Sequence, residues 1–410
     1  MFKKLRKIIG PGLITGASDD DPSGIATYTQ AGAGFGFQFL WTAIITYPLM
    51  ITVQEMCARI GIVTRQGLTG LLKKNYPRPV LWIMILFSFP AITLNISADL
   101  AGMGAVANML IPKIHPSVFA IFFCGILLFN LIYLSYRKIA NILQFLCLVL
   151  LCYFIVPFLS KQNWIEIIKN TFWPEIVFDK KFFALLVGIL GTTISPYLFF
   201  WQTSVEVEEV KARRIFVNKQ LIHEMKTDVR FGIFFSNIIF YFIILAAATE
   251  LHANGITEVF TVDQAALALR PLAGEASYFL FAFGVIGTGL LAIPVLAGSL
   301  SYIISEAFGW KEGLNKKFHQ AKGFYMVMSI SMLLALAITL TGINPVKALI
   351  YTAILYGLTA PVLIGMIMHI CNNKNIMGEY TNKKISNILG ILTLVIMTAA
   401  GGILLWQTFM

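Results

Sequence analysis

The sequence predicts an all-α polytopic membrane protein with about 11 transmembrane helices, and three observations support this fold class. First, 58% of the 410 residues are hydrophobic and 12% are charged, whereas soluble domains carry about 25% charged residues. Second, the chain contains successive apolar segments close to the roughly 20 residues that a spanning helix needs. Third, lysine and arginine gather in alternate loops, as in chains that cross a bilayer repeatedly.

Charged loops separate the predicted spans of the first half of the chain. These spans are residues 16–35, 40–60, 81–110, 119–136 and 139–159. A basic loop from Arg59 to Arg78 separates the second span from the third, and Arg137 and Lys138 separate the fourth from the fifth. Residues 8–160 are therefore expected to hold five helices.

Six further spans complete the predicted topology. They are residues 182–204, 231–248, 278–304, 324–341, 348–371 and 385–406. Basic residues again fill every second loop, from Lys211 to Arg230, from Lys311 to Lys322 and from Lys374 to Lys384. We expect residues 1–410 to form one transmembrane domain, with five helices in 180–372 and an extra helix at 385–407.

The distribution of basic residues predicts the orientation. Positively charged loops stay in the cytoplasm, and most of the 31 Lys and Arg residues fall in the loops on the side of the N-terminus. The sequence therefore predicts an inner-membrane protein with a cytoplasmic N-terminus and an external C-terminus. The net charge of +11 fits contact with anionic membrane lipid and does not require nucleic acid.

Three consecutive acids interrupt the first apolar segment, within the run Ser18-Asp19-Asp20-Asp21-Pro22-Ser23-Gly24. An ionisable side chain at membrane depth costs about 3 kcal/mol or more and usually faces a polar cavity or a partner charge. Pro22 removes a helical hydrogen bond and Gly24 loosens the chain, which frees backbone carbonyls beside the acids. A bound cation would satisfy both the acids and the carbonyls.

A second interrupted helix lies in the sixth span, where Gly188-Ile-Leu-Gly-Thr-Thr-Ile-Ser-Pro-Tyr197 places small residues and a proline in an apolar segment. Pro22 and Pro196 occupy corresponding positions if helices one to five and six to ten are inverted repeats. Transporters of that architecture bind their substrate at the midplane, between paired discontinuous helices. The two halves, about 8–160 and 180–372, are predicted to be such repeats.

Several motifs resemble the NRAMP family of divalent-metal transporters. GPGLITGASDDDPSGIATYTQAGAGFGF resembles the first helix of that family, VQEMCARIGIVTRQGL the second and ADLAGMGAVA the third. Asp228-Val229 at the start of helix seven, HANG at 252–255 and NNKNIMGEY after helix ten also match. The resemblance implies a leucine-transporter-type fold with a 5+5 inverted repeat, and a metal that is cargo, so no cofactor is expected.

Two departures from the family pattern affect the predicted ligands. Typical members carry Asp-Pro-Gly-Asn in the first helix, where this chain has Asp21-Pro22-Ser23-Gly24. The acid is retained and the amide ligand is absent. Typical members carry Met-Pro-His in helix six, where this chain has Ser195-Pro196-Tyr197, so a hydroxyl replaces the thioether.

These changes favour a hard cation. Carboxylate, carbonyl, hydroxyl and water ligands suit Mg²⁺, Ca²⁺ and Mn²⁺, whereas thioether and imidazole favour softer metals. Mg²⁺ also keeps several waters and binds through one or two carboxylates. The pattern is similar to the NRAMP-related magnesium transporters, which implies Mg²⁺ as the main substrate and Mn²⁺ as a further one.

The resemblance carries over a set of site residues. Asp21 is the expected carboxylate ligand, direct or through water, and Ser195 the hydroxyl, while Gly24 provides space. Ser18 and Thr192 are expected to offer backbone carbonyls at the two breaks. On a continuous helix Asp20 and Asp19 would lie about 100° and 200° around from Asp21. Further residues expected around the site or on the pathway are Asp20, Tyr197, Asp99 and Gln202.

Proton coupling is not expected. Proton-coupled relatives carry Asp-Leu-Ala-Glu on helix three and a histidine on helix six. This chain has Asp99-Leu100-Ala101-Gly102 and no histidine in the sixth span. The membrane potential, worth about 2.3 kcal/mol per charge per 100 mV, would drive uptake. Pairing of Asp99 with a basic or polar neighbour is the alternative use of that acid.

Three other acidic features have simpler interpretations. Glu55 is four residues before Arg59, a spacing that predicts an ion pair on one helix face. Asp228 is expected to open helix seven, where a carboxylate suits the positive end of the helix dipole. The acids at 206, 208 and 209 are expected to lie on a solvated inner helix.

Metal transport by another mechanism and other functions are alternatives. A proton-coupled Mn²⁺ or Fe²⁺ importer is the first alternative. An amino-acid or organic-cation carrier of the same fold is a more distant one, because such carriers leave the first break uncharged to receive a carboxylate. The sequence contains no His-Glu-x-x-His, Gly-x-Ser-x-Gly or P-loop pattern, which argues against an enzyme. The oligomeric state stays open, and a monomer is compatible with the sequence.

Overall fold

The computed structural model describes residues 11–133, 148–160, 162–213 and 216–409. Within these ranges every regular element is a helix, and nine continuous helical stretches are long and apolar enough to cross a membrane. One stretch, Pro22–Thr64, joins the end of the first predicted span to the second. The all-α transmembrane fold class is confirmed.

The first predicted helix is broken into two. α2 (Pro11–Asp19) ends just before the acidic run is complete, and α3 (Pro22–Phe35) begins directly after it. Pro22 suits the first position of α3 because that position needs no backbone N–H. Gly36, with a φ of 58°, turns the chain into the short helix that leads to α4.

The rest of the first half follows the predicted order. Its helices are α4 (Leu40–Thr64), α5 (Leu68–Asn75), α6 (Arg78–Leu110), α7 (Pro116–Tyr133), α9 (Cys152–Leu159) and α10 (Trp164–Phe172). The fifth predicted span, 139–159, lies outside the described residues up to 147. On α7, Phe122 and Phe129 are 57% and 61% exposed, as expected for a helix face that contacts lipid.

The second half repeats the interruption. α11 (Lys180–Thr193) and α12 (Pro196–Arg213) are separated by Ile194 and Ser195, so both predicted breaks are present. The later helices are α13 (Lys219–Glu250), α14 (Val262–Ala266), α15 (Arg270–Ala273), α16 (Ser277–Phe308), α17 (Lys322–Thr339), α18 (Pro345–Asn372), α19 (Lys374–Met377) and α20 (Lys384–Phe409).

Helix α13 corrects one expectation. It begins at Lys219, not at Asp228, and the Asn218 side chain caps it by accepting a hydrogen bond from the Leu221 N–H at 2.8 Å. Hydropathy marks only the apolar part of a helix, so the polar first turns were missed. Asp228 instead accepts a hydrogen bond from the Gly12 N–H at 2.6 Å, and so stabilises the N-terminal end of α2.

Small residues allow the broken helices to approach their neighbours closely. A Cβ atom on Gly16 of α2 would lie 2.4 Å from the carbonyl of Gly232 on α13. One on Gly191 of α11 would lie 2.1 Å from the Ala353 carbonyl on α18. Such contacts between small residues are a common way to pack transmembrane helices, and here they position the helices that lead into each break.

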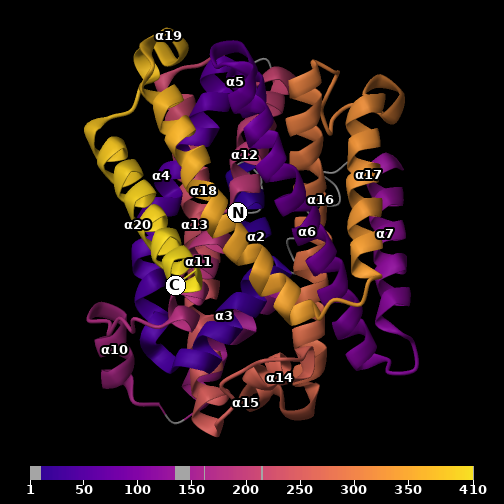
Figure 1. Cartoon of the computed structure of the whole chain (residues 1–410), viewed down its shortest axis with the longest axis vertical. Coiled ribbons are helices and arrows are strands. Elements are labelled where there is room, and N and C mark those ends of the chain that lie inside the picture. Colours follow the sequence, from indigo (N-terminus) through magenta and orange to yellow (C-terminus); the bar gives the residue numbers. More distant parts are fainter. Residues whose placement is uncertain (1–10, 134–147, 161, 214–215, 410) are drawn as a thin grey trace.

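The connecting helices lie at two opposite ends of the bundle (Figure 1). α5 and α19 are at one end, and α10, α14 and α15 are at the other. The first group belongs to loops predicted to face the cytoplasm, and the second to loops predicted to face outside. The alternation of loops along the chain therefore agrees with the predicted topology.

Candidate functional site

The three acids of the first break are all buried. Asp19 is the last residue of α2, and Asp20 and Asp21 form the unwound link to α3. Each of the three is only 1% exposed. Helix ends leave backbone carbonyls and N–H groups without helical partners, so the break collects free polar groups beside three carboxylates.

Asp21 is the best-connected acid of the three. Its Oδ1 accepts hydrogen bonds from the Gly24 N–H and the Ser23 hydroxyl, both at 2.7 Å, so it caps α3. Its Oδ2 accepts a hydrogen bond from Asn95 Nδ2 of α6 at 2.9 Å. Three donors and the positive end of the α3 dipole therefore stabilise a negative charge here.

The break between α11 and α12 lies beside the first one. The Tyr197 hydroxyl of α12 donates to the Ser18 carbonyl of α2 at 3.0 Å. A Cβ atom on Gly24 would lie 3.2 Å from both Thr192 Oγ1 of α11 and Tyr28 Cε2. The structure therefore places Ser18 beside Tyr197 and Gly24 beside Thr192, and side chains of Thr192 and Tyr28 lie next to Gly24.

Ser195 bonds within its own break in this conformation. Its hydroxyl donates to the carbonyls of Thr192 at 2.6 Å and Gly191 at 3.1 Å, and the residue is 1% exposed. The oxygen of the hydroxyl and the carbonyl of Thr192 are thus adjacent. A cation at this break would compete for the Thr192 carbonyl that the hydroxyl now occupies.

Gln202 of α12 connects the two broken helices. Its Oε1 accepts a hydrogen bond from the Thr15 hydroxyl of α2, and its Nε2 donates to Glu206 at 2.9 Å. Glu206 and Glu209 are 4% and 8% exposed. The expectation of a solvated inner helix is therefore wrong for these two acids, because α2, α4 and α16 pack against α12.

Asp19 and Asp20 both face α13. The Ser236 hydroxyl lies 3.2 Å from Asp19 Oδ2 and 3.1 Å from Asp20 Oδ1. The helical spacing expected for the three acids does not apply, because the chain is unwound at Asp20 and Asp21. Asp21 consequently turns towards α6, while its two neighbours turn towards α13.

Asp99 of α6 is buried without an ion pair. It is 0% exposed, lies near Asp21 and the backbone of Ser23, and neither of its carboxylate oxygens has a hydrogen-bond partner among the described residues. The alternative that Asp99 pairs with a basic or polar neighbour is therefore not seen. Its carboxyl group therefore lies close to the first break without a hydrogen-bonded or charged partner among the described residues.

A metal ion here would need mixed oxygen ligands. In the part of the chain that the structure describes, no three His, Cys, Asp or Glu side chains converge as a metal-binding group. Asp21 would therefore have to act with backbone carbonyls, hydroxyls, amides or water. That ligand type suits a hard divalent cation.

Comparison with known proteins gives the family. The sequence model of the family described as natural resistance-associated macrophage protein-like matches residues 12–407. The chain belongs to the NRAMP family. It is accordingly an NRAMP-type divalent metal transporter and not an enzyme, and the metal is its cargo.

Two curated relatives of this NRAMP chain bear the same name. A divalent metal cation transporter MntH from Caldanaerobacter subterraneus subsp. tengcongensis is 25% identical over 413 residues, covering 99% of this chain and 94% of the relative. A protein of that name from Chromohalobacter salexigens is 25% identical over 406 residues, covering 98% and 91%.

Solved structures confirm the leucine-transporter-type fold. The manganese transporter of Eremococcus coleocola, in complex with an aromatic bis-isothiourea compound, superposes with a TM-score of 0.77 at 18% identity, covering 98% of this chain and 86% of that one. MhsT in complex with L-phenylalanine superposes with a TM-score of 0.59 at 14% identity, covering 98% of each chain.

Some polar residues at the first break were not predicted from the resemblance to the NRAMP family. Asn95, Ser236 and Ser23 all bond to the acidic run, yet none was among the expected site residues. The available signal was weak: Asn95 and Ser236 are polar residues within long apolar segments. Such residues usually face the bundle interior, but their spacing does not tell which acid they contact.

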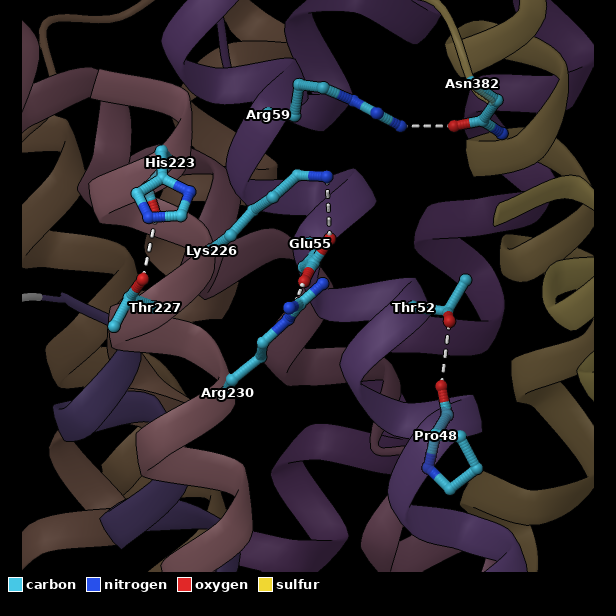
Figure 2. Close-up of polar contacts among 9 residues, drawn as sticks. All are labelled: Pro48, Thr52, Glu55, Arg59, His223, Lys226, Thr227, Arg230 and Asn382. Carbon is cyan, nitrogen blue, oxygen red and sulfur yellow. Dashed lines mark hydrogen bonds and ion pairs between the residues drawn. The ribbon is translucent and has the colours of Figure 1, made fainter. Parts of the chain in front are cut away.

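A second polar cluster joins α4 to α13 (Figure 2). Glu55 Oε1 lies 2.7 Å from Arg230 Nε, and Glu55 Oε2 lies 3.3 Å from Lys226 Nζ. Arg59 donates instead to the side chain of Asn382, between α19 and α20. The expected pairing of Glu55 with Arg59 is therefore wrong, because the first turns of α13 bring two other bases within reach of the carboxylate.

Proposed function

We propose that this NRAMP-family chain imports Mg²⁺ across the inner membrane, accepts Mn²⁺ as a further substrate and does not require proton coupling. The observation that carries the proposal is the donor set at the two breaks. Asp21 contributes a buried carboxylate with three hydrogen-bond donors, and Ser195 contributes a hydroxyl at the position of the thioether in typical members. Oxygen donors of this kind favour a hard cation.

The mechanism needs ligands that can be exchanged. The hydroxyl of Ser195 holds the Thr192 carbonyl, and that of Tyr197 holds the Ser18 carbonyl. An entering cation would take over these carbonyl oxygens, directly or through its waters, while Asp21 supplies the charge. Because Mg²⁺ dehydrates reluctantly, retained waters would make most of the contacts to the neutral groups.

The residues at two positions on α6 and α12 support transport without strict proton coupling. Asp99 is retained, but Gly102 stands one helical turn later where proton-coupled relatives have a glutamate, and α12 contains no histidine. Asp99 therefore has no glutamate or histidine at these two positions to exchange a proton with. The inward electrical gradient on a doubly charged cation then supplies the driving force.

The proposed orientation follows the basic loops. The side that holds α5, α19 and the first turns of α13 would face the cytoplasm, and the C-terminus would lie outside. Mg²⁺ would then enter from the side of α10, α14 and α15. A monomer would suffice for this cycle, because both breaks come from one chain.

A proton-coupled manganese importer is the second candidate, because the Eremococcus coleocola protein that shares this fold is a manganese transporter. Uptake by the purified protein in liposomes, over a panel of divalent cations and with the internal pH recorded, separates the two. We expect saturable Mg²⁺ uptake with counterflow, inhibition of Mn²⁺ uptake by millimolar Mg²⁺, and no acidification. Mn²⁺ uptake that is not inhibited by Mg²⁺ and that acidifies the liposome lumen would overturn the proposal.

A further inference from the structure

Asn95 on α6 stands out among the buried polar groups of the molecule. It is 0% exposed, and its Nδ2 donates to Asp21 Oδ2 at 2.9 Å. Its other end, Oδ1, is buried and has no hydrogen-bond partner within the described ranges. Leaving a buried amide oxygen unpaired costs about 1–3 kcal/mol, so the oxygen is expected to have a partner that none of the described residues supplies.

We propose that Asn95 supplies the amide oxygen of the cation site, directly or through one water, in place of the amide that the first helix lacks. The inference rests on the proposed function only in assuming that Asp21 binds the transported divalent cation. It assigns a substrate-contacting role to a residue of α6, 74 positions from Asp21 in the chain.

The surroundings of Gly24 explain why the amide would come from another helix. A side chain at position 24 would start 3.2 Å from Thr192 Oγ1 and 3.2 Å from Tyr28 Cε2, which is too close for an unhindered asparagine. Asn95 reaches the Asp21 carboxylate from α6 and does not meet that crowding. The sequence pattern Asp21-Pro22-Ser23-Gly24 therefore does not remove the amide from the site.

The chemistry of an amide suits both states of the site. Its NH₂ group donates and its carbonyl oxygen accepts, and rotation about the Cβ–Cγ bond exchanges the two ends. Without a cation, Nδ2 donates to the Asp21 carboxylate, as observed. With a cation next to Asp21, the exchanged amide presents Oδ1 to the ion or its water shell. Neutral amide oxygens are ordinary ligands of hard divalent cations.

A purely structural role for Asn95, holding the Asp21 carboxylate in place, predicts different mutant behaviour. Asn95→Leu removes both ends of the amide at similar size. Asn95→Asp keeps an oxygen ligand but loses the NH₂ donor. If only the NH₂ donor of Asn95 matters, both variants lose cation affinity equally. If the amide oxygen is a ligand, Asn95→Asp keeps more affinity than Asn95→Leu. Thr93→Val is the matched control, since Thr93 is also buried on α6 and its hydroxyl has no hydrogen-bond partner among the described residues.

The test measures the binding of Mg²⁺ and, separately, of Mn²⁺ to the purified full chain by isothermal titration calorimetry at pH 7.5. We expect Asn95→Leu to weaken both affinities by about 10- to 100-fold, the range found when supporting ligands of metal sites are lost. Asn95→Asp is expected to stay within about threefold of wild type, because it keeps a hard oxygen ligand. Thr93→Val is expected to match wild type.

Unchanged affinity in Asn95→Leu, or equal losses in Asn95→Leu and Asn95→Asp, would overturn the role of Asn95. Size-exclusion profiles establish that each variant is folded, and Asn95→Ala replaces Asn95→Leu if the larger side chain prevents folding. The design separates this inference from the proposed function. If wild type binds Mn²⁺ but not Mg²⁺, the magnesium proposal fails, while the Mn²⁺ affinities of the variants still decide the role of Asn95.

Discussion

Replacing Asp21 tests two roles that the structure gives to one carboxylate, a helix cap and a cation ligand. Asp21→Ala removes the acceptor for the Gly24 N–H, the Ser23 hydroxyl and Asn95 Nδ2. Loss of an N-cap costs about 0.5–2 kcal/mol, and an unpaired buried amide costs about 1–3 kcal/mol more. We therefore expect Asp21→Ala to lower the free energy of unfolding by about 1.5–5 kcal/mol and to abolish transport.

Asp21→Asn separates the two roles. Asparagine is as good an N-cap as aspartate, so its side-chain oxygen can still accept from the Gly24 N–H, but the negative charge is gone. We expect a melting temperature in detergent near that of wild type and a loss of cation affinity of more than about 100-fold. The assays are thermal unfolding by tryptophan fluorescence and Mg²⁺ uptake into liposomes. Wild-type uptake by Asp21→Asn would refute the assignment of this carboxylate as the charged ligand.

Three further predictions concern selectivity, packing and pH. Ser195→Met places a thioether at the second break and is expected to shift the preference from Mg²⁺ towards Mn²⁺; competition between the two ions measures this, and an unchanged ratio would count against the ligand argument. Glu55→Gln removes the shared partner of Lys226 and Arg230, whose side chains are 26% and 57% exposed, so we expect the free energy of unfolding to fall by about 0.5–1 kcal/mol, and by less in high salt. The control is Glu258→Gln, which breaks an exposed pair with Lys181 and should have no measurable effect; equal losses in the two variants would contradict the prediction. Burial and the nearby charge of Glu306 raise the pKa of Glu312 to about 8. Between about pH 5 and 8 the folded state therefore keeps a proton that the unfolded state releases, and stability should fall as pH rises. Glu312→Gln should make the melting temperature depend less on pH, and an unchanged pH dependence would show that Glu312 does not cause the effect.

The overall fold could be predicted because its signals are local. Apolar segments mark the bilayer crossings, and Pro22 and Pro196 with their small neighbours mark the two interruptions. Hydropathy could not show where helices continue into water. This is why α13 was expected to begin at Asp228, when its polar first turns already begin at Lys219.

The candidate site could be predicted only in part. Asp21 is indicated by the acidic run, while Ser18 and Thr192 come from the resemblance to the NRAMP family, and the structure places the two breaks side by side. The contacts made by Asn95 and Ser236 depend on how distant helices rotate about their axes. A polar residue in an apolar segment indicates a buried face, but one sequence does not show which partner that face meets. The ion pairs of Glu55 were missed for the same reason.

Anomalous X-ray scattering from crystals grown with Mn²⁺, collected with and without excess Mg²⁺, tests the central claim most directly. We predict an anomalous peak beside Asp21 Oδ2, between the two breaks and within reach of Asn95. The peak should disappear when millimolar Mg²⁺ is added. A peak elsewhere in the molecule, or one beside Asp21 that excess Mg²⁺ leaves unchanged, would contradict a magnesium site built on this carboxylate.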